Sequence, residues 1–196
     1  MTRRLSVVGA LALAVAAVDT GSALHAAGLE EPVTRECGSS VYGDVGGDWM
    51  RSSIVVGPLA FVRARSYASS TSRFSTVGGG RYRGSKMLAL VRTGWVARVV
   101  VPAAERRVVA LQYAREHFNR AVVPADGEHE VTFKACPPGR PLLGPSTARW
   151  TQFNGAIVIA GRRCVTLAVF AAKQGHPLPA KPLRARLSFG AGACRR

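Results

Sequence analysis

Apolar and polar side chains alternate without exception in the stretch Glu130-Val131-Thr132-Phe133-Lys134-Ala135. A period of two places successive side chains on opposite faces of an extended chain. Val131, Phe133 and Ala135 therefore belong to the buried face of a strand, and the residues between them belong to a solvated face. The same alternation returns over residues 183–189. Together the two stretches predict a sheet that is half buried.

The remainder of the chain after residue 36 consists of short apolar runs separated by glycine and proline. Roughly seven to nine strands without interleaved helices predict an all-β chain, folded as a single antiparallel β-sandwich of immunoglobulin-like or jelly-roll-like type. Short connections at Thr93-Gly94 and at residues 161–163 predict hairpins between the runs that flank them. Over residues 102–120 we favour a strand, because Val108-Val109 is β-branched, followed by a helical turn within residues 114–119.

The first 26 residues have the pattern of a secretory signal peptide. Arg3-Arg4 supply positive charge, residues 5–18 form an apolar stretch, and small residues follow it. A membrane anchor is the alternative, but as a helix this stretch is too short to span a membrane. It would cover only about 21 Å of a hydrocarbon core that is roughly 30 Å thick. Cleavage is expected between Ala23 and Ala27, so residues 27–196 are predicted to form one secreted, extracytoplasmic domain.

The chain contains four cysteines, at Cys37, Cys136, Cys164 and Cys194. None belongs to a Cys-x-x-Cys motif, which argues against thioredoxin-like redox chemistry and zinc ribbons. In an oxidising compartment the set predicts two structural disulfides, and three pairings are possible. We favour Cys37–Cys194 with Cys136–Cys164. The first bond would join the ends of the domain, and the second would join two strands if they are antiparallel neighbours. The other two pairings stay open.

Basic residues dominate the charge, with 27 Lys and Arg against 11 Asp and Glu and a net charge of +16. Five arginines interleave with aromatic residues and are candidates for binding an anion: Arg63, Arg65, Arg73, Arg81 and Arg83. We expect their partner to be an anionic cell-envelope polymer or a membrane surface and not nucleic acid, which is a poor partner for an exported protein. The alternative is a solvated sheet face, as predicted for Arg184 and Arg186, in a chain of arginine-rich composition.

Acidic and histidine side chains gather near a turn at residues 125–127, where His117, Asp126 and His129 are weak candidates for metal ligands. Their spacing sets no coordination geometry, so we favour a solvated turn and predict neither a metal nor a cofactor. A small secreted hydrolase or metal-dependent enzyme with its site near these residues is the alternative. No Gly-x-Ser-x-Gly motif is present, and no catalytic residue is assigned.

Several short segments resemble exported proteins of high-GC actinobacteria that have no assigned activity: Glu36-Cys37-Gly38, residues 57–61, residues 133–137, Phe153-Asn154-Gly155 and residues 161–165. The resemblance is patchy over residues 36–170. It implies an exported, disulfide-linked β-domain and transfers no functional residues. We therefore expect a module without enzymatic activity that has a binding or structural role at or outside the cell envelope.

Overall fold

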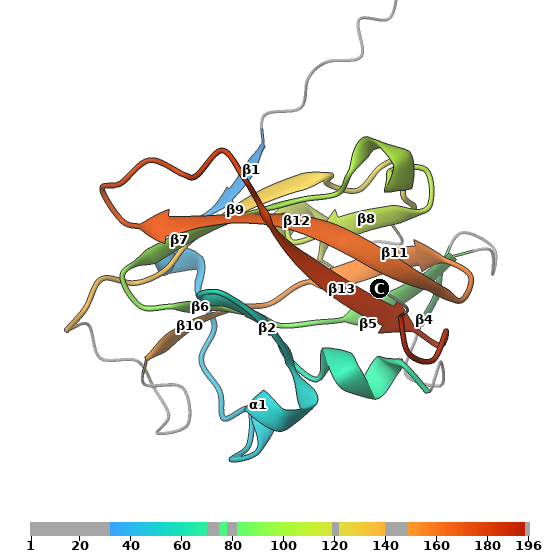
Figure 1. Ribbon diagram of the computed structural model, residues 1–196, viewed down its shortest axis with the longest axis horizontal. Helices are drawn as coiled ribbons and strands as arrows, with labels where there is room; N and C mark the ends of the chain where they lie inside the picture. The colour runs from blue at the N-terminus through green and yellow to red at the C-terminus, as the bar shows by residue number, and fades with distance from the viewer. Residues whose placement is uncertain (1–31, 70–74, 78–81, 119–121, 140–148, 195–196) are drawn as a thin grey trace, which may run out of the picture. The chain divides into compact units, whose positions relative to one another are not determined.

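Strands make up most of the regular structure in this computed structural model, which describes residues 32–69, 75–77, 82–118, 122–139 and 149–194 (Figure 1). The predicted signal peptide lies outside these residues. The strands are β1 (Val33–Arg35), β2 (Ile54–Val56), β3 (Leu59–Phe61), β4 (Ser75–Val77), β5 (Tyr82–Lys86), β6 (Ala89–Arg92), β7 (Trp95–Val100), β8 (Val109–Gln112), β9 (Glu130–Lys134), β10 (Trp150–Phe153), β11 (Ala156–Ala160), β12 (Arg163–Lys173) and β13 (Leu183–Phe189). The helices are one turn long: α1 (Trp49–Ser52) and the 3-10 turns η1 (Cys37–Ser39), η2 (Ala64–Tyr67), η4 (Ala103–Glu105) and η5 (Arg115–His117).

The described strands form three sheets, with orders β1-β9-β7-β12-β13, β10-β6-β3-β2 and β4-β5-β11-β8. The all-β class is confirmed. The predicted arrangement is not, because thirteen strands in three sheets replace one sandwich of fewer strands. The pairing is also not wholly antiparallel, since β1 runs parallel to β9. The predicted number of strands was too low because a turn can divide one apolar run into two strands. Residues 54–61, for example, form both β2 and β3.

The first alternating stretch behaves as predicted: in β9, Val131 and Phe133 are buried and Lys134 is exposed. The second follows the prediction only in its middle, where Arg184 and Arg186 are exposed and Ala185 is buried; at its ends Leu183 is exposed and Ser188 is buried, against the prediction. Within residues 102–118 the strand β8 and the helical turn η5 follow the prediction, but the segment begins with the 3-10 turn η4 and not with a strand.

The two predicted hairpins are wrong. Thr93-Gly94 connects β6 to β7 and residues 161–162 connect β11 to β12, but in both cases the two strands belong to different sheets. Both hydrogen-bonding edges of β7 are occupied, by β9 and β12, and both edges of β6 are occupied by β3 and β10. The short turns therefore carry the chain from one sheet to the next.

The predicted disulfide pairing is also wrong. Cys37 bonds to Cys136 and Cys164 bonds to Cys194, with Cα–Cα distances of 4.7 Å and 5.7 Å. Our prediction assumed that β9 and β12 are antiparallel neighbours. Instead β7 lies between them and is antiparallel to both, so β9 and β12 run in the same direction. Cys136 follows the end of β9 and Cys164 lies at the start of β12, which places them at opposite ends of the sheet.

Side chains from all three sheets meet in one main core. Three aromatic rings lie in contact within it. The Tyr113 and Phe133 ring centroids are 5.0 Å apart, and those of Phe133 and Phe153 are 5.2 Å apart. A second, smaller cluster contains Trp49, whose ring stacks edge-on against Trp150 at 5.6 Å. Among the described residues, no helix has the length and apolar character needed to cross a membrane.

Gly155 is required by the position of Tyr113. A Cβ at residue 155 would lie 2.2 Å from Cδ1 of the Tyr113 ring. That ring has no room to move, because it is fully buried and its hydroxyl donates to the Met87 carbonyl at 2.9 Å. We expect Gly155→Ala to lower the free energy of unfolding by about 3 kcal/mol, measured by urea denaturation. Gly43→Ala, where a Cβ meets nothing within 4 Å, is the control and should change stability by less than about 0.5 kcal/mol. Equal effects of the two substitutions would contradict the prediction.

Candidate functional site

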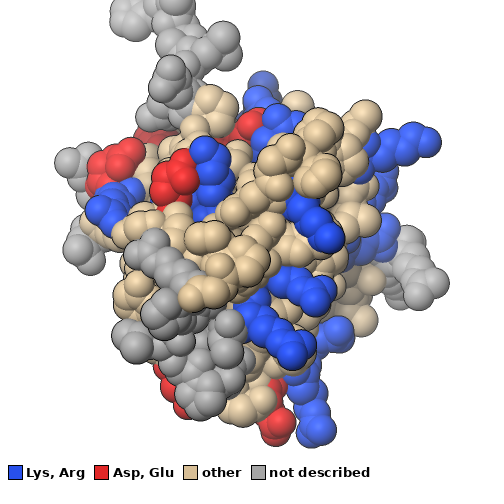
Figure 2. Space-filling view, turned by 90° about the vertical axis from the view of Figure 1, so that its left-hand side faces the viewer, with Lys and Arg blue, Asp and Glu red and all other residues tan. Residues whose placement is uncertain are grey.

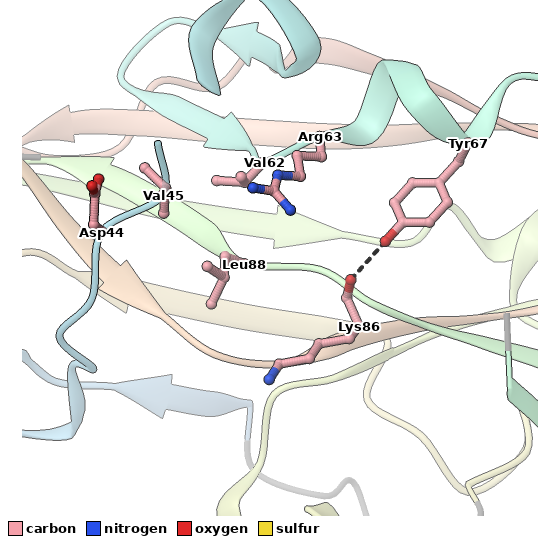
Figure 3. A pocket seen from close by; sticks show the side chains of 7 residues that line it. All are labelled: Asp44, Val45, Val62, Arg63, Tyr67, Lys86 and Leu88. Atoms are coloured by element: carbon pink, nitrogen blue, oxygen red, sulfur yellow. Dashed lines mark hydrogen bonds between the residues drawn. The ribbon is translucent and has the colours of Figure 1, made fainter. Parts of the chain in front are cut away.

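A pocket of about 490 Å³ opens beside β3, η2 and the end of β5 (Figure 3). Its apolar lining comes from Val45, Val62 and Leu88, and its charged lining from Arg63, Lys86 and Asp44, with Tyr67 also in the wall. In Figure 3 the Arg63 and Lys86 side chains extend from opposite walls, and Asp44 lies at the end of the pocket beside Val45. Concave sites with an apolar lining and a few polar groups are typical of small-ligand binding.

Arg63 has an unusual backbone conformation. Its φ of 58° makes it the only non-glycine residue with positive φ in the described part of the chain. Three hydrogen bonds hold this conformation: the Arg63 amide donates to Ser53 Oγ at 3.1 Å, and its carbonyl accepts from the Ser66 amide at 3.0 Å and hydroxyl at 2.7 Å. A left-handed arginine costs about 1–3 kcal/mol, and such strain is concentrated at functional sites. These bonds fix the backbone from which the Arg63 side chain extends at the pocket.

Lys86 is the second cation of the pocket and is positioned by its own backbone. The Tyr67 hydroxyl donates to the Lys86 carbonyl at 2.9 Å, which ties the end of β5 to η2. Among the described residues, neither the Lys86 ammonium nor the Arg63 guanidinium has an ion-pair or hydrogen-bond partner. With two cations against one acid, Asp44, the lining of this pocket has a net positive charge, which favours an anionic ligand.

Of the five predicted anion-binding arginines, the structure places Arg63 at this pocket. Arg65 lines a separate pocket of about 300 Å³, and its Nε donates to the Ser53 carbonyl at 2.9 Å. Arg83 lies on β5, but its side chain lies outside the described structure, as do Arg73 and Arg81. On the face seen in Figure 2, Lys and Arg side chains are spread in several groups separated by uncharged surface. Sequence reasoning missed Lys86, because it followed the arginines only.

The weak metal candidates make three different sets of contacts. Asp126 is exposed in its turn, and His129 places Nε2 3.0 Å from the Pro124 carbonyl. His117 instead contacts the Glu128 carboxylate through Nδ1. In the described ranges no group of three or more His, Cys, Asp or Glu side chains is arranged to hold a metal ion.

Glu128 belongs to a buried polar cluster with structural contacts. Its carboxylate accepts from the Tyr113 amide at 2.6 Å and from the Ala114 amide at 3.3 Å, in addition to His117. The carboxylate therefore holds the end of β8 next to η5 and satisfies two backbone donors.

Arg35, which sequence reasoning also missed, lies in the same region and is only 3% exposed. Its guanidinium donates to three backbone carbonyls: Tyr113 at 2.6 Å, Asn154 at 3.1 Å and Ser39 at 2.8 Å. Burial, and then the positive charge of Arg115, lower the pKa of Arg35 from its usual value. Burial raises the pKa of Tyr113, which keeps that hydroxyl neutral and able to donate.

Ser39 lies at the end of η1, and its hydroxyl is engaged in two hydrogen bonds. Ser39 Oγ accepts from Arg35 Nε at 2.9 Å and donates to the Glu36 carbonyl at 2.8 Å. Through these contacts the Arg35 and Glu128 side chains join strands and turns.

Comparison of the chain with protein-family models, with curated proteins and with solved structures finds no match.

Proposed function

We propose that the chain is an exported β-sheet module, without enzymatic activity, that binds an anionic ligand of the cell envelope through Arg63 and Lys86. One observation carries this proposal: two cations without partners face an apolar-lined pocket from opposite walls. The location outside the cytoplasm is supported by the two disulfides, which persist in oxidising compartments. It is supported as well by the predicted signal peptide.

The pocket favours binding over catalysis on chemical grounds. Arg63 and Lys86 are charged donors without an acceptor, so they can hold a carboxylate, sulfate or phosphate group by charge-assisted hydrogen bonds. The histidines and the buried Glu128 do not line the pocket. Among its described lining residues, the pocket lacks the pairing of a nucleophile with a base that acyl or glycosyl transfer requires.

Affinity for heparin, a sulfated polymer, tests the proposal. We expect the double variant Arg63→Gln/Lys86→Gln to bind an immobilised heparin fragment about tenfold more weakly than the unaltered protein, because each lost contact involves a charged group. The measurement is the dissociation constant at about 0.1 M salt, where surface charges separated by more than about 10 Å are screened.

The matched control is Lys173→Gln/Arg184→Gln, which removes one lysine and one arginine from exposed positions on β12 and β13 that do not line the pocket. Both double variants lower the net charge by the same amount. Affinities reduced equally in the two variants would mean that heparin responds to net charge alone, which would overturn the proposal. Unchanged thermal unfolding of each variant establishes that the pocket has kept its fold.

A further inference from the structure

A second pocket, of about 320 Å³, shares two lining residues, Val45 and Arg63, with the first. The second pocket is lined further by Asp48, Trp49 and Arg51, together with Gly46 and Ser52. Because Arg63 lines both, the two pockets are adjacent, and we call the pair the Arg63 groove. A ligand that fills it must be elongated, with an anionic group near the middle.

The Asp48 carboxylate is the lining group that most restricts the chemical class of the ligand. It immediately precedes α1, yet its carboxylate makes no capping hydrogen bond to that helix. Among the described residues it also has no ion-pair partner. A carboxylate without a partner in a groove repels an anionic group placed next to it but accepts hydrogen bonds from hydroxyl groups. The groove therefore combines cations that suit an anion with an acceptor that suits a hydroxyl.

We infer that the Arg63 groove binds an acidic oligosaccharide, a chain of sugar units that bear carboxylate or other anionic groups as well as free hydroxyls. This inference rests on the proposed function and specifies its ligand. An anionic group lies between Arg63 and Lys86, and the neighbouring sugar unit extends into the second pocket, where its hydroxyls donate to Asp48. Arg51 lies in the same pocket and supplies a further donor to that unit.

The alternatives use only part of the groove. A neutral oligosaccharide would leave the Arg63 and Lys86 charges unpaired, and a small inorganic anion would leave the second pocket empty. A polyanion without hydroxyls would place negative charge beside Asp48, which costs free energy at short range. Of the five charged side chains that line the two pockets, an acidic sugar chain offers a partner to four: Lys86, Arg63, Arg51 and Asp48.

The direction in which Asp48→Ala changes the affinity distinguishes an acidic sugar chain from a polyanion without hydroxyl groups. We expect Asp48→Ala to weaken binding of trigalacturonate about five- to tenfold, because a hydrogen bond to a charged acceptor is lost. The same substitution should strengthen binding of tripolyphosphate, which carries no carbon-bound hydroxyl and is repelled by the carboxylate. Asp126→Ala removes an exposed acid that does not line the groove and should leave both affinities unchanged. Isothermal titration calorimetry measures all of these affinities.

Two further ligands complete the experiment. The affinity for monomeric galacturonate should fall in Arg63→Gln/Lys86→Gln but stay the same in Asp48→Ala. Maltotriose, which is neutral, should bind at least tenfold more weakly than trigalacturonate. Stronger binding of both trigalacturonate and tripolyphosphate to Asp48→Ala would overturn the oligosaccharide inference and leave the anion-binding function standing. If Arg63→Gln/Lys86→Gln binds tripolyphosphate and trigalacturonate as well as the unaltered protein does, the proposed function itself fails.

Discussion

Replacing Cys37 and Cys136 together by alanine is expected to lower the free energy of unfolding by about 5 kcal/mol. The bond joins residues separated by 99 positions, so it removes much of the conformational freedom of the unfolded chain. It also links η1, next to the short parallel strand β1, to the end of β9. Urea denaturation at neutral pH measures the loss, and the same variant should unfold at a markedly lower temperature.

The second disulfide provides the comparison. Cys164 and Cys194 are separated by only 30 positions, so alanine at both should cost less, about 3.5 kcal/mol. The order of the two losses is the informative result. A larger loss at the Cys164–Cys194 bond would contradict an account based on loop length and would place the main effect of the bonds in the folded state.

Replacing Arg35 by methionine is expected to lower the free energy of unfolding by about 3–5 kcal/mol. Methionine keeps an unbranched apolar stem, but the carbonyls of Ser39, Tyr113 and Asn154 lose their charged donor. The Arg35 guanidinium also lies 5.3 Å from the centre of the Phe118 ring and 5.7 Å from that of Phe153, and this packing is lost too. One buried side chain thus connects β1, η1, the end of β8 and the segment after β10.

Two variants separate the geometry of Arg35 from its charge. Arg35→Lys keeps the charge but not the planar fork that reaches several carbonyls, so we expect it to lose at least half of the stability lost in Arg35→Met. Arg184→Met changes an exposed arginine on β13 and should alter stability by less than about 0.5 kcal/mol. If Arg35→Lys is as stable as the unaltered protein, a positive charge at residue 35 is enough for stability. That result would contradict a role for the planar fork of donors.

Local patterns were enough to predict the strand class and the buried faces. Val131 and Phe133 in β9 point inward because alternation is a property of the extended backbone and needs no knowledge of the neighbouring strands. The number of cysteines likewise predicted two disulfides. The hairpins at Thr93-Gly94 and residues 161–163 failed, because a short turn joins strands of one sheet or of two sheets with the same sequence signature.

The candidate site was only partly predictable for a related reason. Arg63 could be named from the density of arginines around it, but Arg65, two residues later, belongs to a different pocket. Lys86 and Asp48 are 23 and 15 residues from Arg63 in the chain, and no spacing rule connects them to it. These residues come close together only because of the way β3, β5 and α1 pack. The number of charged residues in the sequence gives no information about that packing.

The sequence alone thus established an all-β chain with four cysteines available for two bonds, since these properties depend on neighbouring residues and on composition. The partners of those cysteines and of Arg35 were settled only by the tertiary structure. They follow from strand order, with β7 between β9 and β12, and strand order is selected by burial of the whole core rather than by any one segment. The Arg63 groove is a product of the same packing.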